Sequence, residues 1–167
     1  MTTPTQPARA MAALIDGRSE FTAALRHALS QAARTRAREL CFVDTDFEAW
    51  PLEDPVVLNA LSTWARLPKR RLLVIACRFD ALPRRCPRFT EWRRTWAHAI
   101  ECRATEVEPS QVPTLLLAGP HSLHLADRLQ WRGHWLADDS ELGAWREVVD
   151  VLMQRSDVDF PANTLGL

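Results

Sequence analysis

Glycine is scarce in this chain, which has 5 glycines among 167 residues. The phosphate-binding patterns GxxxxGKS/T and GxGxxG do not occur, and neither does the nucleophile pattern GxSxG. Because backbone cradles for phosphate depend on closely spaced glycines, we do not expect this chain to bind nucleotides in the manner of those folds.

Paired cysteines and long apolar runs are also missing. The chain has 4 cysteines and no CxxC spacing, which predicts reduced, partly buried thiols rather than disulfides or a zinc site. No apolar run approaches the ~18 residues of a membrane-spanning helix, and the amino-terminal segment is too weakly apolar for a signal peptide. We therefore expect a cytoplasmic protein with no membrane partner.

The formal net charge is zero, with 21 basic and 21 acidic residues, so composition gives no overall bias towards nucleic acid. The charge is nevertheless uneven, because residues 83–96 hold five arginines and a single acid. This segment predicts a helix with its tryptophans inside and its arginines outside, which is either an ordinary solvated face or a surface for an anionic ligand or nucleic acid. The candidate binding residues are Arg78, Arg84, Arg88 and Arg93.

The length fits one domain. Apolar periodicity predicts strands at 11–15, 40–43, 71–77, 100–104, 114–118 and 122–125, with a further candidate at 130–136, and helices beginning at residues 19, 54, 86 and 139. The predicted order is βαβαβαβββα, an α/β fold with a single mixed sheet flanked by helices. We expect a disordered leader over 1–10, the domain over 11–155 and a C-terminal tail over 156–167.

Two carboxylates, Asp44 and Asp46, directly follow the strand at 40–43, and open α/β sheets place their ligands at such strand ends. An apolar strand followed by DxD also resembles the haloacid dehalogenase-like phosphohydrolases, which implies a Mg-dependent enzyme with these two aspartates as catalytic residues. The rest of such a site is missing from the sequence. These enzymes need a Ser or Thr at the end of a second strand, whereas the strand at 71–77 ends in Cys77-Arg78. A solvated loop or a capping role for these side chains is the simpler interpretation.

Three histidines and an aspartate lie close together in the sequence, at His121, His124, Asp127 and His134. Imidazole and carboxylate groups suit zinc or iron. Residues three apart on a strand point to opposite faces, however, so His121 and His124 are poorly placed to share an ion. We predict no metal site and no cofactor.

The apolar strand within residues 111–119, together with the element order, resembles one half of the phospholipase D-like phosphodiesterases. That family carries H-x-K-x4-D around such a strand, with His as nucleophile, Lys holding the phosphate and Asp supporting the site. Gln111, Pro113 and Ala118 stand at these three places in this sequence. Neither proline nor alanine can perform the chemistry of the residue that it replaces.

The resemblance implies a catalytically inert domain that acts as a binding or accessory module, like small bacterial relatives of the family. Because the family's catalytic unit takes two halves, it also implies a homodimer. The sequence thus predicts that the chain is not an enzyme, and it names no specific ligand.

Overall fold

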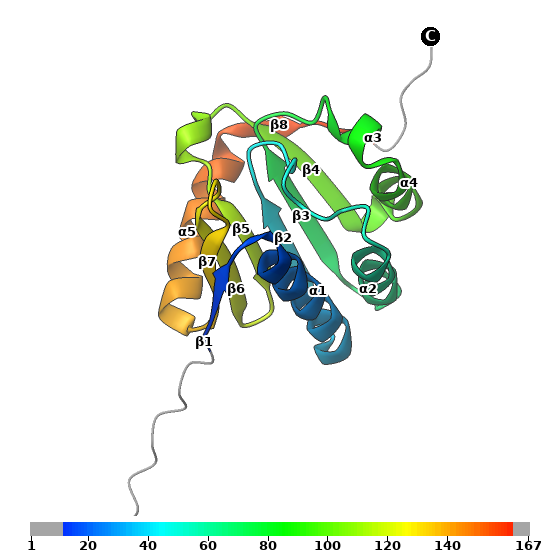
Figure 1. The fold of residues 1–167 in the computed structure, drawn as a ribbon. Coiled ribbons are helices and arrows are strands. Elements are labelled where there is room, and N and C mark those ends of the chain that lie inside the picture. Colours follow the sequence, from blue (N-terminus) through cyan, green and yellow to red (C-terminus); the bar gives the residue numbers. More distant parts are fainter. Residues whose placement is uncertain (1–11, 162–167) are drawn as a thin grey trace, which may run out of the picture.

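Eight strands form one mixed sheet in the computed structural model, which describes residues 12–161 (Figure 1). Their spatial order is β1-β7-β6-β5-β2-β3-β4-β8. The predicted leader over 1–10 lies outside the described residues. In chain order the strands are β1 (Ala12–Asp16), β2 (Glu39–Val43), β3 (Arg71–Ala76), β4 (Ile100–Thr105), β5 (Thr114–Ala118), β6 (His121–Asp127), β7 (Arg132–Ala137) and β8 (Ser156–Val158).

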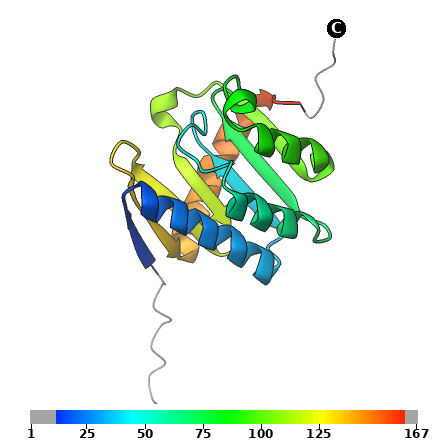
Figure 2. The same ribbon diagram turned by 45° about the vertical axis from the view of Figure 1, so that its right-hand side comes forward.

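Helices cover both faces of this sheet. Figure 2 shows α1, α2 and α4 side by side on one face, with α5 behind the sheet. The predicted α/β class, with one mixed sheet flanked by helices, is confirmed, and the candidate strand at 130–136 is β7. The helices are α1 (Arg18–Thr35), α2 (Pro55–Ala65), α3 (Leu82–Arg85), α4 (Pro87–Thr95) and α5 (Asp139–Gln154), and two 3-10 turns are η1 (Ala97–Ala99) and η2 (Pro109–Gln111).

Strand direction determines which loops meet. Strands β2, β3 and β4 are parallel, whereas β5 runs antiparallel to β2 and β6 antiparallel to β5. The ends of β2, β3, β4 and β6 and the beginning of β5 therefore lie at one edge of the sheet, which we call the carboxyl edge. The opposite edge, where β2, β3 and β4 begin, is the amino edge.

The helices form for the reasons that the sequence indicates. The inner stripe of α1 buries Phe21, Leu25 and Leu29 against the sheet. Helix α2 begins at a proline after Asp54, whose side chain accepts hydrogen bonds from two backbone N–H groups of the first turn. Helix α5 has Asp138 as its N-cap, which accepts from the Glu141 backbone N–H.

The domain extends further than expected at its C-terminal end. Strand β8, inside the predicted tail, pairs antiparallel with β4, and the ring of Phe160 is buried and stacks on Phe79. The domain boundary predicted at residue 155 is therefore wrong. Because β8 is short and mostly exposed, the apolar pattern on which strand prediction relies is missing there.

The arginine-outside pattern predicted for α4 is wrong at one position. Arg93 is 6% exposed, whereas Arg88 and Arg94 on the same helix are exposed. Helical spacing explains this, because Arg93 lies four residues after the buried Phe89 and so shares its inner face.

No helix in the described part of the chain has the length and apolarity needed to cross a membrane.

Candidate functional site

Three polar side chains from distant parts of the chain meet at the carboxyl edge. Asp44 follows β2, Thr114 begins β5 and Arg128 follows β6. The antiparallel pairing of β2 with β5 and of β5 with β6 brings these strand ends together. Asp44 therefore lies at a strand end where side chains of other strands converge, as expected. Thr114 and Arg128, which contact it there, are not among the candidate site residues from the sequence.

Asp44 has no solvent-exposed surface, and its carboxylate is fully engaged inside the protein. The Thr114 hydroxyl donates to Oδ1 at 2.5 Å, and the Phe47 backbone N–H donates to Oδ2 at 2.9 Å. Arg128 Nη2 lies 3.4 Å from Oδ2. Burying a carboxylate is unfavourable unless donors and a counter-charge accompany it, and here both are present.

Burial raises the pKa of Asp44 above its ordinary value, because desolvation outweighs its favourable contacts. The hydrogen bond from Thr114, the charge of Arg128 and the Phe47 N–H all act in the opposite direction, whereas Asp46 adds to the rise. Of the two simpler interpretations, the solvated loop is wrong for Asp44, which is buried. The capping interpretation agrees with the structure, because Asp44 accepts from the Phe47 backbone N–H three residues on and so anchors the loop that follows β2.

Arg128 links this anchor to solvent. Its side chain is 34% exposed, Nη1 donates to the Thr45 hydroxyl at 2.6 Å, and Nη2 also lies 3.7 Å from Asp46 Oδ1. No further hydrogen bond joins its guanidinium to a described residue. With five N–H donors on a guanidinium, Arg128 retains donors for a ligand on its exposed side.

A cleft of about 490 Å³ opens beside Arg128, on the face of the sheet that α5 covers. Its walls combine an aromatic ring, apolar side chains and a few polar groups, a combination typical of small-molecule sites. Gln111 and Pro113 both line it, at the end of η2 and just before β5. The remaining lining residues are Pro109, Ser110, Val112, Thr114, His124, Leu125, Ala126, Arg128, Trp145 and Val148.

The structure separates Ala118 from this cleft. Ala118 is buried at the far end of β5, beside Leu40 and His121 in the sheet. It lies five positions after Pro113 along the extended chain, a distance of about 16 Å. Of the three positions that the resemblance singled out, two therefore lie at the cleft and one lies near the amino edge.

The histidines of β6 divide between the two faces of the sheet, as predicted. The ring of His121 stacks on Trp135 at 4.6 Å on the α1 side, whereas the ring of His124 lies 4.4 Å from Trp145 of α5. Burial lowers the pKa of His124, and the neighbouring His134 lowers it further. His124 therefore presents a neutral imidazole to the cleft at neutral pH.

The carboxylate of Glu141 on α5 contacts His134 and not His124. Glu141 Oε1 lies 2.7 Å from His134 Nε2 and accepts from the Trp145 indole N–H at 3.4 Å. No described carboxylate makes a hydrogen bond to His124. An imidazole nucleophile or base is normally oriented by such a partner, and His124 lacks one among the described residues.

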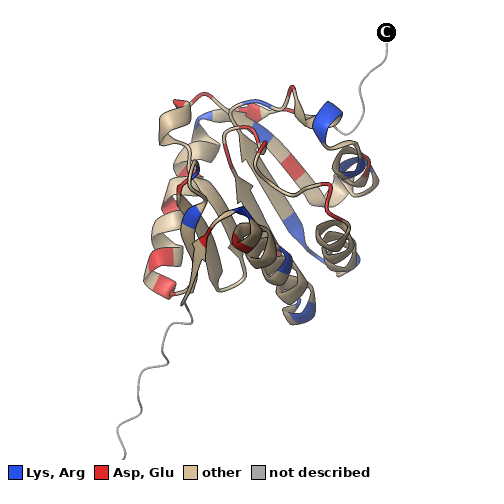
Figure 3. Ribbon diagram, viewed as in Figure 1, with Lys and Arg blue, Asp and Glu red and all other residues tan. Residues whose placement is uncertain are grey.

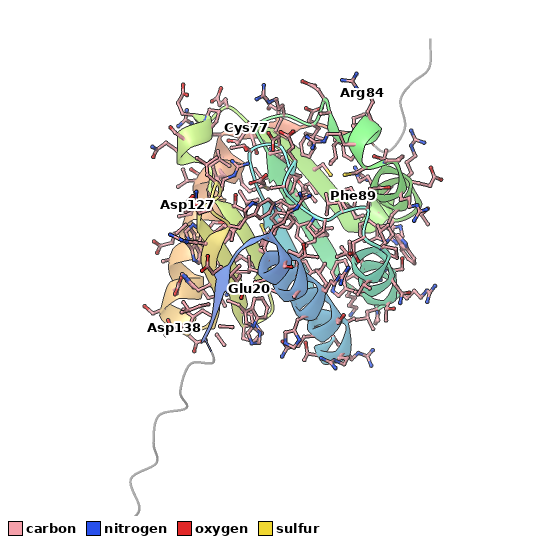
Figure 4. The ribbon with its side chains drawn as sticks, in the orientation of Figure 1. Glu20, Cys77, Arg84, Phe89, Asp127 and Asp138 are labelled. Carbon is pink, nitrogen blue, oxygen red and sulfur yellow. The ribbon has the colours of Figure 1, made fainter. Side chains whose placement is uncertain are left out.

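Burial raises the pKa of the Cys77 thiol, and the charges of Asp44 and Asp46 add to the rise. Cys77 follows β3 at the carboxyl edge (Figure 4). A raised pKa disfavours the thiolate, the nucleophilic form of cysteine. In the described part of the chain, no group of three or more His, Cys, Asp or Glu side chains is placed to hold a metal ion. The edge therefore offers no obvious nucleophile.

The predicted basic surface carries fewer free arginines than the sequence of its segment suggests. Figure 4 shows Arg84 on α3 pointing away from the domain, and Arg88 and Arg78 are also exposed. Arg85 forms an ion pair with Glu48, and Arg94 Nη1 lies 3.4 Å from Glu91 Oε2. With Arg93 buried, the exposed arginines without an ion pair to a described residue on this face are Arg78, Arg84 and Arg88.

Comparison with solved structures shows a phospholipase D-like fold. Nuc from Salmonella typhimurium, a phospholipase D family member, matches with a TM-score of 0.62 and 6% sequence identity, over 90% of this chain and 99% of Nuc. TrmBL2, an archaeal chromatin protein described as showing a novel mode of DNA binding, matches with a TM-score of 0.62 and 15% identity. That match covers 92% of this chain and 56% of TrmBL2, so this chain spans little more than half of TrmBL2.

The sequence itself gives no match to any model of a protein family. It gives no match to a curated protein either. The likeness to Nuc and TrmBL2 therefore concerns the fold, and any function has to be inferred from the site.

Proposed function

We propose that this chain is a single phospholipase D-like domain that has lost phosphodiesterase activity and binds an anionic ligand in the carboxyl-edge cleft. The proposal rests on one observation: the polar groups at this edge are unsuited to catalysis but leave donors free for an anion. Gln111 and Pro113, which the resemblance aligns with the family's His and Lys, line the cleft, and both oxygens of the nearby buried Asp44 carboxylate have donors.

The structure offers little support for a phosphohydrolase based on Asp44 and Asp46. A nucleophilic carboxylate has to reach a phosphorus atom, and a Mg²⁺ ligand has to face the ion. Asp44 has no exposed surface, and one of its oxygens accepts from Thr114 while the other accepts from a backbone N–H. Freeing this carboxylate would leave three donors without their partner.

Arg128 supports binding of an anion at the same place. Asp44 and Asp46 hold its guanidinium at the cleft wall, and its free N–H groups match the oxygens of a phosphate or carboxylate. The same two carboxylates offset its charge, so we expect weak binding that relies on hydrogen-bond geometry rather than on net charge.

A turnover assay tests the loss of catalysis. We expect no hydrolysis of bis(4-nitrophenyl) phosphate above the enzyme-free rate with Mg²⁺, Mn²⁺ or Zn²⁺. Turnover that disappears in Gln111→Ala, or in Asp44→Asn and Asp46→Asn, would overturn this part of the proposal.

Calorimetric titration with inorganic phosphate tests the binding site. We expect Arg128→Lys, which keeps the charge and loses the planar set of donors, to weaken binding about 10-fold or more, the worth of a charge-assisted hydrogen bond. The matched control is Arg132→Lys, because Arg132 is exposed at the same edge and pairs with Asp16. Equal losses in the two variants, or no binding at millimolar phosphate, would remove the cleft as an anion site.

A homodimer remains a prediction from the family resemblance. Trp135 is 8% exposed and the Trp131 ring packs against Phe21, so these two tryptophans form no fully exposed aromatic face for a partner subunit. Light scattering during size-exclusion chromatography measures the mass directly. A monomer at micromolar concentration would contradict the prediction.

Nucleic-acid binding is a second candidate function. The likeness to TrmBL2, which is described as binding DNA, supports the class of partner. The surface predicted for it holds three exposed arginines without a described ion-pair partner, which makes it a weak electrostatic site.

A further inference from the structure

We propose that the amino edge of the sheet binds the phosphate backbone of duplex nucleic acid. This inference rests on the second candidate function, nucleic-acid binding. It locates the binding site at the opposite edge of the sheet from the cleft. The amino-edge basic surface consists of Arg34, Arg36, Arg38, Arg66 and Lys69.

Two segments that are about thirty residues apart in the sequence form this surface side by side. The loops after α1 and after α2 enter the parallel neighbours β2 and β3, and the Arg71 backbone N–H donates to the Arg38 carbonyl oxygen at 2.8 Å. The Trp64 indole N–H also donates to the Ala37 carbonyl oxygen at 2.6 Å. Residues of both loops line a hollow of about 260 Å³: Arg36, Ala37, Arg38, Leu67, Pro68 and Lys69.

The charge on this edge is strongly one-sided. Residues 34–39 and 66–71 contain seven basic side chains and one acid, Glu39. Arg71 is occupied by an ion pair with Glu101, and Arg70 stacks on the ring of Trp96. The five side chains of the amino-edge basic surface are exposed and form no ion pair with a described residue. Figure 3 shows blue at the end of α1 and at the beginning of β3.

Helix stabilisation accounts for part of this charge. Cations near a helix C-terminus offset the negative end of the helix dipole, and α1 and α2 both end at this edge. The effect is confined to the last turn, which for α1 contains Arg34 and for α2 contains no basic residue. Arg36 and Arg66 are the C-cap residues of these helices and also lie at their negative ends, whereas Arg38 and Lys69 lie beyond them, so the dipoles leave part of the cluster unexplained.

The surroundings favour a phosphate backbone over other polyanions. The ring of Trp96, between α4 and η1, is half-buried and covered by Arg70, so it offers no free platform for stacking unpaired bases. Large exposed apolar side chains are scarce here: Val56 lines the groove between α1 and α2 together with Arg34, so a membrane surface would find a single valine as its anchor. The other large exposed apolar residues, Leu14, Leu129, Val151 and Val158, lie on other elements.

Fluorescence polarisation with a fluorescein-labelled DNA duplex tests the inference. Four or five phosphate contacts predict that affinity falls roughly 100- to 500-fold between about 50 mM and about 200 mM salt. The triple variant Arg36→Gln, Arg38→Gln, Lys69→Gln removes three contacts, so we expect binding at least about tenfold weaker at low salt and a salt-dependent loss of only roughly tenfold.

The matched control removes the same charge from the other candidate surface. In Arg78→Gln, Arg84→Gln, Arg88→Gln we expect binding within about twofold of the unmodified chain. Equal losses in the two triple variants, or a larger loss in the control, would overturn the amino-edge site while leaving DNA binding itself in place. No binding to the duplex at low salt would overturn both the site and the second candidate function. Binding to vesicles of anionic phospholipid without binding to DNA would do the same. Thermal unfolding confirms that both variants fold.

Discussion

The buried contact between Thr114 and Asp44 makes a prediction that can be worked out in detail. Thr114→Val removes a hydroxyl and keeps the shape of the side chain, so its main effect is the loss of the 2.5 Å hydrogen bond to the carboxylate. Hydrogen bonds to charged groups contribute about 1.5–3 kcal/mol. Because Asp44 is fully buried, water cannot replace the lost donor, and we expect destabilisation of about 2–3 kcal/mol at neutral pH.

The effect should depend on pH with a definite sign. The folded-state pKa of Asp44 is raised, so the stability that this carboxyl contributes is present below its unfolded pKa and is lost as pH rises through the folded pKa. The Thr114 hydroxyl favours the ionised form and limits that loss. Thr114→Val should therefore cost more at about pH 7.5 than near pH 4, because a larger fraction of Asp44 is ionised at the higher pH and a hydrogen bond to a neutral group contributes only about 1 kcal/mol.

Urea unfolding followed by tryptophan fluorescence measures the effect as a lower midpoint, by about 1 M at neutral pH. Thr90→Val is the matched control, because its buried hydroxyl donates to a neutral acceptor, the Cys86 carbonyl oxygen, at 2.9 Å. We expect the control to lose about 1 kcal/mol or less at both pH values. A cost for Thr114→Val that equals the control, or that does not change with pH, would refute the buried, ionised anchor.

Two further predictions concern the fold. Gly133→Ala should destabilise the domain by more than about 3 kcal/mol or prevent folding, because an added Cβ would lie 1.9 Å from the His124 carbonyl oxygen. Gly143→Ala on α5 is the control, since its added Cβ would have nothing within 4 Å, and it should be neutral or stabilising. A thermal unfolding scan measures both variants. Phe160→Ala should cost about 3 kcal/mol in urea unfolding if the C-terminal strand belongs to the domain, whereas an effect below about 0.5 kcal/mol would restore the predicted boundary at residue 155.

Much of the fold could be predicted because its elements carry strong local patterns. The apolar run of β3 and the Asp54-Pro55 start of α2 indicate their structures within a few residues. Strand β8 lacks such a pattern, since it is held by pairing with β4 rather than by its own apolar face. Arg93 shows the same limit, because its inward position follows from the exact helix register.

The candidate sites depend on contacts that no local pattern contains. Asp44 was noticed as a residue after a strand, but its burial follows from partners 70 and 84 residues away, Thr114 and Arg128. The amino-edge basic surface combines two modest basic segments that become one only because β2 and β3 are neighbours. The sequence did contain a signal for this surface. Consecutive parallel strands are usually neighbours, so the two basic loops that precede them could have been expected to lie side by side.

The central claim is binding without catalysis, and one sample can test it. Fluorescein-labelled duplex DNA is titrated with the protein in low salt with Mg²⁺, polarisation is read, and the same DNA is then examined on a denaturing gel. The account predicts polarisation that rises with protein, falls with salt, and leaves the DNA intact. Cleavage that disappears in Gln111→Ala would contradict the loss of catalysis, and polarisation that never rises would contradict duplex binding at the amino edge.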